Sequence, residues 1–266
     1  MEYKYAKYNT LLNKITNKDN LFVGNYTLDP YQNCEFGCRY CDSTFDNIIY
    51  IKSDSLQLLE KEIKKIEKGM IIVGSVVDPY QEAEKKHKIT RKLLKIIEHN
   101  NFSAHILTKS DLVLRDIDIL SKIEGCIVTI SIISLDGTVL NIFEKNVPSS
   151  KERLNVMRKL SENGIKTGLA VMPLLPFIVE EELEEIVKTA KQNGAHYLLH
   201  KHLELKGDQK AIFLKILSEL NPDLVNKYEE LYSGSYMPDQ AHIAKVKDMV
   251  DKYCRKYDMP QTYRGF

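Results

Sequence analysis

The 266-residue sequence has no tryptophan, almost no net charge and no long apolar run. Lys and Arg total 38 against 37 Asp and Glu, so no bulk positive field attracts phosphate backbones. Nucleic acid stays possible as a substrate, but the composition does not favour it. No run approaches the roughly 18 to 20 apolar residues that span a bilayer, and the first ten residues lack the apolar segment of a signal peptide. These absences predict a cytoplasmic protein with no membrane contact.

Cysteine is scarce and unevenly placed. Three of the five cysteines, Cys34, Cys38 and Cys41, fall within eight residues. In a reducing compartment such crowding favours metal ligation or catalysis over disulfides. Cys126 and Cys254 stand alone, and we expect both to be small buried residues.

After this cluster the sequence alternates apolar, β-rich runs with amphipathic stretches. Near-continuous apolar strands separated by helices are typical of parallel strands covered by helices. The expected strands are residues 21–28, 70–77, 103–109, 126–133, 166–175 and 195–205. The expected helices are residues 55–68, 89–100, 113–123, 149–164 and 180–194. Six β/α units predict an α/β fold, a partial (β/α)6 TIM-like barrel, with a doubly wound sheet as the alternative.

We expect one domain made of three parts. Residues 1–20 form an N-terminal extension and residues 21–205 the partial barrel. Residues 206–266 contain only helical patterns and form a C-terminal helical extension packed on the barrel. No linker rich in Gly or Ser separates these parts. Functional groups are expected at the carboxyl ends of the strands, where the following loops begin.

The segment DPYQNCEFGCRYCD arranges Cys34, Cys38 and Cys41 as C-x3-C-x2-C, in a loop after the first expected strand. Cysteine thiolates hold iron–sulfur clusters, and four ligands saturate a cubane. Three cysteines with no obvious fourth ligand would leave one iron open. An open iron can chelate a small molecule, as the open position does in catalytic zinc sites.

A zinc site is the alternative interpretation of the cysteines. Zinc sites usually assemble four ligands as two pairs, and no second pair at a suitable spacing follows. His196, His200 and His202 share one face of an expected strand and are the nearest further ligands. This alternative predicts a non-catalytic module that binds zinc or nucleic acid.

The C-x3-C-x-aromatic-C pattern, with Tyr40 as the aromatic residue, resembles the signature of the radical S-adenosylmethionine superfamily. The resemblance implies a [4Fe-4S] cluster on the three cysteines, whose open iron binds S-adenosylmethionine. It further implies reductive cleavage of that cofactor to a 5′-deoxyadenosyl radical, which removes a hydrogen atom from a substrate. An electron donor such as flavodoxin or ferredoxin is implied as well. The substrate and the bond changed are left open.

Other stretches resemble the spore photoproduct lyase-like branch of that superfamily, among them GSVVDPYQEAE, LTKSDLVLRDIDIL and FEKNVPSSKERLNVMRKLSENGI. This resemblance places contacts to S-adenosylmethionine at the backbone of Tyr40 and at Ser75, Lys109 and Ser131. Lys109 can pair with the methionyl carboxylate, and the hydroxyls can bond the carboxylate or the ribose. A solvated strand end for Lys109 and local turn bonding for the serines are the alternatives.

Two further sets of residues bear on the reaction. Asp78, Tyr80 and Gln81 follow the second expected strand and are candidates for substrate contact, although a β-turn on Asp78 and Pro79 explains the same residues. The DNA-repairing lyase carries a hydrogen-donating cysteine just after that strand, and the equivalent residue here is Ser75. A hydroxyl O–H bond is too strong to replace the thiol. The sequence therefore favours a radical enzyme, lyase-like or modifying, with an unidentified substrate over a repair lyase.

Glu144 and Arg153 are expected to form an ion pair that brackets the fourth loop.

Overall fold

The computed structural model describes residues 1–16, 21–41 and 47–262. Residues 17–20 of the expected N-terminal extension and 263–266 of the expected helical extension therefore lie outside the described residues. Residues 42–46 of the expected barrel, which directly follow the last cysteine of the motif, lie outside them too.

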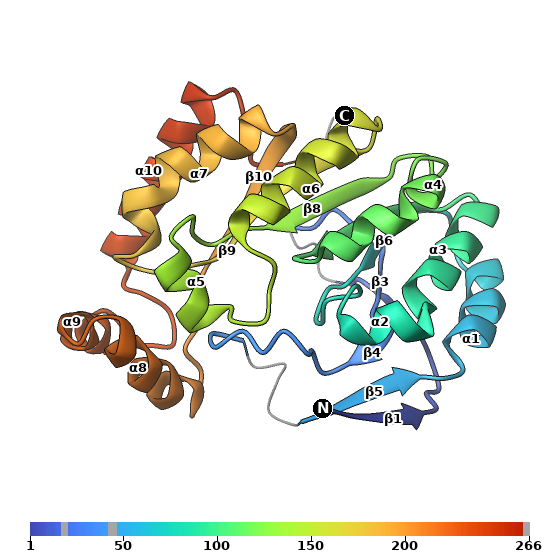
Figure 1. Cartoon of the computed structure of the whole chain (residues 1–266), viewed down its shortest axis with the longest axis horizontal. Coiled ribbons are helices and arrows are strands. Elements are labelled where there is room, and N and C mark those ends of the chain that lie inside the picture. The colour runs from blue at the N-terminus through green and yellow to red at the C-terminus, as the bar shows by residue number, and fades with distance from the viewer. Residues whose placement is uncertain (17–20, 42–46, 263–266) are drawn as a thin grey trace.

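A seven-stranded sheet forms the centre of the molecule (Figure 1). Six of its strands are parallel and lie in chain order, and β2 (Leu12–Lys14) pairs antiparallel with the first of them. The parallel strands are β3 (Tyr26–Leu28), β6 (Met70–Val73), β7 (Ser103–Thr108), β8 (Ile127–Ser131), β9 (Lys166–Leu174) and β10 (Ala195–His202). In the described part of the chain β2 and β10 are the two edges, so the sheet is open. The expected α/β fold with six parallel strands is confirmed.

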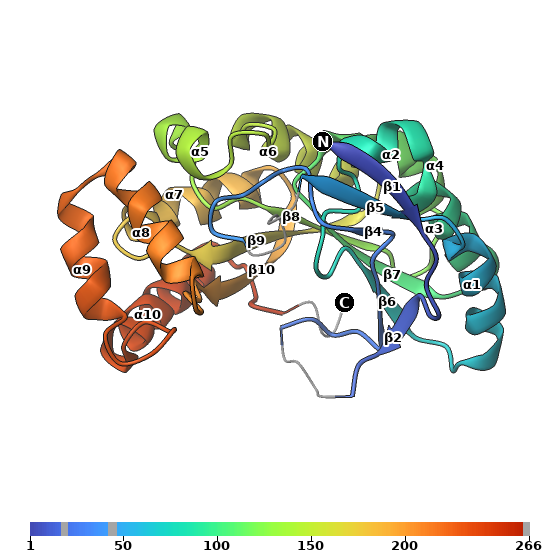
Figure 2. The same cartoon turned by 90° about the horizontal axis from the view of Figure 1, so that it is seen from below.

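The helices between the parallel strands cover one face of the sheet (Figure 2). They are α1 (Ser55–Glu62), α2 (Glu82–His87), α3 (Ile89–His99), α4 (Ile117–Leu120), α5 (Gly137–Phe143), α6 (Ser150–Glu162) and α7 (Val179–Gln192). Short 3-10 helices occupy Ile63–Lys65 and Asp111–Asp116. A doubly wound sheet would carry helices on both faces, so this one-sided arrangement favours the partial barrel.

The start of α6 shows how local sequence sets an element boundary. The Ser149 hydroxyl accepts a hydrogen bond from the Glu152 amide at 3.3 Å, and the Glu152 carboxylate accepts one from the Ser149 amide at 2.8 Å. This reciprocal capping box satisfies amides that have no partner within the helix. The helix ends before Gly164, whose φ of +74° few other residues adopt readily.

The N-terminal residues contribute to two sheets. β1 (Glu2–Ala6), β5 (Ile48–Lys52) and β4 (Tyr31–Gln32) form a three-stranded sheet in that order, beside the cysteine loop. β2 extends the main sheet. Only three residues of the expected strand 21–28 form β3, because Leu21, Phe22 and Val23 pack instead against the inner face of β8 and β10.

Three helices follow β10: α8 (Gln209–Leu220), α9 (Asp223–Leu231) and α10 (Gln240–Lys256). α8 and α9 stand beyond the β10 end of the sheet, and α10 packs against α7 (Figure 1). After α10 the chain returns to the edge strand, where the Leu198 amide donates a 2.9 Å hydrogen bond to the Pro260 carbonyl. Among the described residues no helix is long and apolar enough to cross a membrane.

Candidate functional site

The cysteine loop follows β4 and lies over the carboxyl ends of β6, β7 and β8. Cys34, Cys38 and Cys41 all line one cavity of about 160 Å³ there, and the Cys41 amide donates to the Cys38 carbonyl at 3.0 Å. Burial raises the pKa of the Cys34 thiol to about 11 and that of Cys38 to about 12, while the nearby Lys109 opposes the shift at both. Metal ligation requires thiolates, so a metal bound here would displace these protons.

A buried glutamine fixes the loop to the segment after β6. The Gln81 side chain accepts from the Glu35 amide at 2.8 Å and donates to the Asn33 carbonyl at 3.2 Å. The Glu35 carboxylate in turn accepts from the Ala83 amide at 2.6 Å. Gln81 is completely buried and lines neither cavity described here. The expected substrate contact therefore serves to position the loop that carries Cys34.

Lys109, at the end of β7, faces the cysteines and lines the same cavity. Its amide donates to the Asp78 carboxylate at 2.7 Å, and the neighbouring Thr108 hydroxyl donates to the other oxygen at 2.7 Å. Burial works to lower the pKa of Lys109, but the charges of Cys38, Glu144 and Asp78 outweigh it and raise the pKa. The ammonium group lies 6.0 Å from the centre of the Tyr40 ring. The cavity thus pairs thiols with a fixed positive charge.

The two predicted serines line the same cavity but differ in their hydrogen bonding. The Ser131 hydroxyl is buried and has no hydrogen-bond partner among the described residues. The Ser75 hydroxyl donates to Asp29 at 2.8 Å. A buried hydroxyl without a partner is rare, and a site that binds a ligand is one physical explanation for it. The donor set of this cavity, three sulfurs with an ammonium and a hydroxyl, therefore fits a cluster and a zwitterionic cofactor.

The other two substrate candidates differ in placement. Asp78 lines the small cavity, with its oxygens bonded to Thr108 and Lys109. Tyr80 is 1% exposed, lines neither cavity and donates to Asp116 at 3.2 Å. Like Gln81, it belongs to the packing beneath the loop.

A buried ion pair supports the loop from its other side. Arg153 on α6 and Glu144 after α5 lie 2.7 Å apart, with side chains 1% and 0% exposed. Glu144 also accepts a hydrogen bond from the Tyr40 hydroxyl, and Arg153 donates to the Ser131 carbonyl at 2.8 Å. The expected ion pair is confirmed, and it connects the aromatic residue of the motif to the end of β8.

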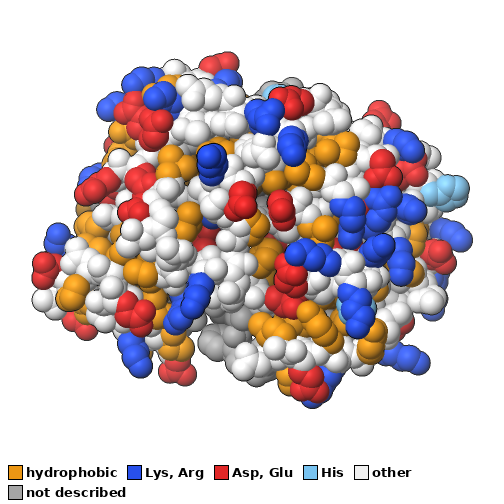
Figure 3. Space-filling model, in the orientation of Figure 1, with side chains coloured by type: hydrophobic (Ala, Val, Ile, Leu, Met, Phe, Trp, Pro, Cys, Tyr) orange, Lys and Arg blue, Asp and Glu red, His pale blue; other side chains and the backbone are white. Residues whose placement is uncertain are grey.

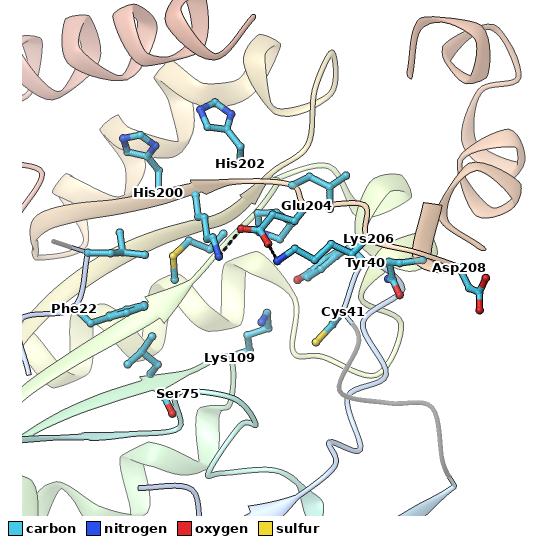
Figure 4. Close-up of a pocket in the computed structure, with 17 residues that line it drawn as sticks. Phe22, Tyr40, Cys41, Ser75, Lys109, His200, His202, Glu204, Lys206 and Asp208 are labelled. Atoms are coloured by element: carbon cyan, nitrogen blue, oxygen red, sulfur yellow. Dashed lines mark ion pairs between the residues drawn. The ribbon is translucent and has the colours of Figure 1, made fainter. Parts of the chain in front are cut away.

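A second cavity of about 1140 Å³ adjoins the first. The two share Tyr40, Cys41, Ser75, Leu107, Lys109 and Met172. At its far side Glu204 forms ion pairs with Lys201 at 2.8 Å and Lys206 at 2.5 Å (Figure 4). Sequence patterns do not single out these residues, although Lys201 lies at the end of β10 and Glu204 and Lys206 follow it. Their position at the carboxyl end of the last strand is the available signal.

The floor of the small cavity includes Thr129 on β8. Its hydroxyl is bonded to the Tyr197 hydroxyl and lies 2.6 Å from His105 Nε2. His105 is completely buried, and burial lowers its pKa to about 3. A neutral chain of hydrogen-bonded side chains thus lies beneath the small cavity.

The histidines of the zinc alternative do not complete a metal site. His200 and His202 project from β10 away from Lys109 and Ser75 (Figure 4), while His196 lies 3.3 Å from the Thr167 carbonyl. Within residues 1–16, 21–41 and 47–262, no three His, Cys, Asp or Glu side chains are arranged to hold a single ion. A cubane does not require such convergence, because each cysteine binds a different iron.

Comparison with known proteins agrees with this geometry. Residues 28–190 match the family model of the Radical SAM superfamily. An uncharacterized protein of Methanocaldococcus jannaschii is 32% identical over 59% of this chain and 63% of its own length. An uncharacterized protein of Mycobacterium tuberculosis is 24% identical over 95% of this chain and 80% of its own length. The matched region therefore spans less than two thirds of the archaeal relative.

Two solved structures show the same fold. Spore photoproduct lyase complexed with dinucleoside spore photoproduct superposes with a TM-score of 0.74 and 18% identity, over 96% of this chain and 79% of that chain. Streptococcus suis SuiB bound to S-adenosylmethionine superposes with a TM-score of 0.56 and 14% identity, over 76% and 47%. The first overlap spans nearly the whole chain, including the C-terminal helices.

Proposed function

Since the chain belongs to the radical S-adenosylmethionine superfamily, we propose that it binds a [4Fe-4S] cluster on Cys34, Cys38 and Cys41 and cleaves S-adenosylmethionine to modify a substrate in the larger cavity. The observation that carries this proposal is the small cavity, where the three cysteines, Lys109 and the unpartnered Ser131 hydroxyl meet. When bound, the cluster and S-adenosylmethionine supply a 5′-deoxyadenosyl radical that removes a hydrogen atom from the substrate.

The protein groups of the small cavity bind and orient the cofactor in this proposal. Lys109 places a positive charge where a methionyl carboxylate can pair with it. The Ser131 hydroxyl donates to a cofactor oxygen, and the backbone at Tyr40 contacts the adenine. Asp78 keeps the end of β7 in place through its bonds to Thr108 and Lys109.

The larger cavity holds the substrate in this proposal. It opens directly from Cys41, Ser75 and Lys109, so a bound molecule can reach the cofactor without crossing a barrier of protein. Its volume of about 1140 Å³ exceeds the roughly 300 to 1,000 Å³ of drug-sized ligand sites. Charges of both signs, on Lys201, Glu204 and Lys206, suit a polar substrate.

Anaerobic reconstitution with iron and sulfide tests the proposal. We expect wild-type protein to bind about four iron and four sulfide ions per chain and, once reduced by dithionite, to release 5′-deoxyadenosine. Cys38→Ala should lose both properties, whereas Cys254→Ala should keep both, because Cys254 lies on α10 away from the cavity. A wild-type protein with a complete cluster that leaves S-adenosylmethionine intact would contradict the proposal.

Repair of spore photoproduct in DNA is a second candidate function. Its support is the overlap with spore photoproduct lyase along 96% of this chain. Against it, the sequence resemblance puts Ser75 where the repair lyase carries its hydrogen-donating cysteine, and the Ser75 hydroxyl is bonded to Asp29. Incubating the reduced, reconstituted protein with dinucleoside spore photoproduct separates the two candidates. Release of the repaired dinucleotide favours repair, and an unchanged lesion beside continued 5′-deoxyadenosine formation excludes it.

A further inference from the structure

An exposed cluster of aromatic and basic side chains lies outside both cavities. Tyr3 and Tyr5 on β1 are 40% and 65% exposed, and each makes an edge-on contact with the His87 ring, at 5.9 and 5.7 Å between ring centres. Exposed lysines flank them on α2, at its end and on α3. We call Tyr3, Tyr5, Lys86, His87, Lys88 and Lys92 the tyrosine–lysine patch.

The patch exposes three lysines that are not held in ion pairs within the described part of the chain. None of its three lysines forms an ion pair with a described residue. Two nearby acids are paired with other lysines, Glu82 with Lys85 at 2.7 Å and Glu2 with Lys4 at 3.5 Å. A third, Glu35, is buried beneath Tyr3 and is hydrogen-bonded to the Tyr3 hydroxyl and the Ala83 amide. Figure 3 shows Lys and Arg side chains gathered over the region where α2 and α3 lie in Figure 1. This charge is local, because the whole chain has a net charge of only +1.

One short hydrogen bond joins the patch to the cysteine loop, and a second joins the loop to α2. The Tyr3 hydroxyl donates to the Glu35 carboxylate at 2.6 Å, and Glu35 directly follows Cys34 in the chain. The same carboxylate accepts from the Ala83 amide in the first turn of α2, also at 2.6 Å. A protein seated on the patch is therefore separated from the loop by one side chain.

The patch is also separate from the substrate entrance. None of its six residues lines either cavity described above. A partner on the patch and a substrate in the larger cavity can thus be bound at the same time. This separation favours a partner protein over the substrate as the occupant of the patch.

We infer that the tyrosine–lysine patch is the docking surface for an acidic one-electron carrier protein. The inference rests on the proposed function, because only a chain holding a cluster on Cys34, Cys38 and Cys41 needs an electron delivered beside Cys34. In the step itself one electron leaves the reduced carrier and one electron enters the site, and no bond or proton is exchanged. Electron-transfer complexes have small interfaces and depend on complementary charge, which a compact basic patch with exposed aromatic rings provides.

Charge reversal tests the surface with flavodoxin as the probe. We expect Lys86→Glu/Lys92→Glu to raise the Kd for oxidised flavodoxin roughly tenfold at low ionic strength, because two attractive charges become repulsive. Titration calorimetry measures this binding. The matched control is Lys151→Glu/Lys159→Glu, an equal change of charge on exposed residues of α6, which should leave the Kd unchanged.

A second measurement separates this inference from the proposed function. Flavodoxin-driven release of 5′-deoxyadenosine should fall in the patch variant, while dithionite-driven release should equal that of wild type. If the patch variant binds flavodoxin like wild type, or the α6 control weakens binding as much, the docking surface is wrong and the proposed function is unaffected. If dithionite yields no 5′-deoxyadenosine from any protein, the proposed function fails, and calorimetry still decides whether the patch binds the carrier.

Discussion

The buried pair of Arg153 and Glu144 gives the most quantitative prediction. Their side chains are 1% and 0% exposed, so replacing either one leaves the other charge buried without its partner. Such a loss costs about 3–5 kcal/mol of the free energy of unfolding. We expect Arg153→Met and Glu144→Leu each to lower the free energy of unfolding by an amount in this range. If the two losses simply added, they would total about 6–10 kcal/mol.

The double variant should cost much less than that sum. With both charges gone, the remaining losses are the hydrogen bonds of the Tyr40 hydroxyl and the Ser131 carbonyl, at about 1–3 kcal/mol each. We therefore expect the double variant to lose about 2–6 kcal/mol. Urea unfolding of the cluster-free protein, followed by circular dichroism, measures all three values under the same conditions.

An exposed pair on the same helix provides the control. Arg158 and Glu162 on α6 are 46% and 56% exposed and 2.6 Å apart, and a pair of this kind contributes only about 0.3–0.5 kcal/mol. Arg158→Met should change stability by no more than that. A cost for Arg153→Met as small as that for Arg158→Met would contradict this prediction. So would a double variant whose cost equals the sum of the costs of Arg153→Met and Glu144→Leu to within about 0.5 kcal/mol.

Two further predictions concern single buried groups. Ser131→Ala should leave the stability of the cofactor-free protein unchanged, because the hydroxyl has no hydrogen-bond partner among the described residues to lose. The same variant should weaken S-adenosylmethionine binding to the reconstituted protein about tenfold. Equal affinities of variant and wild type by calorimetry would show that Ser131 does not contact the cofactor. Burial lowers the pKa of His105 to about 3, so between about pH 6.5 and 3 the unfolded chain binds a proton that the folded chain does not. Stability therefore decreases as the pH is lowered, by up to about 1.4 kcal/mol per pH unit. His105→Gln should flatten that slope in urea titrations from pH 7 to 5, and equal slopes would show that His105 does not titrate this way.

The sequence predicted the elements whose pattern is local. The parallel strands could be identified because they are continuously apolar, and α6 because a capping box precedes it and Gly164 follows it. β1 was not predicted, because four of its five residues are exposed and its hydrophobic pattern therefore carries little signal. β4 is only two residues long. Their stability comes from pairing with β5, which is not visible in the sequence of either strand.

The candidate site divides in the same way. The cysteine motif could be recognised because its three ligands are close in the chain. The positioning role of Gln81 could not be recognised from the sequence, because its hydrogen-bond partners lie nearly 50 positions away in the chain. Lys201, Glu204 and Lys206 were missed for a related reason. Their charges suggest an ordinary solvated surface until the fold places them on the wall of the larger cavity.

The return of the chain to β10 has a consequence for behaviour in concentrated solution. An unpaired strand edge offers its amides and carbonyls to any other extended chain, and this is how many β-proteins aggregate. Here the Pro260 carbonyl accepts a hydrogen bond from the Leu198 amide on the edge strand. Proline has no backbone N–H, so Pro260 cannot donate a hydrogen bond to a further strand. The segment after α10 thus covers part of the β10 edge and hinders the addition of a strand from a second molecule.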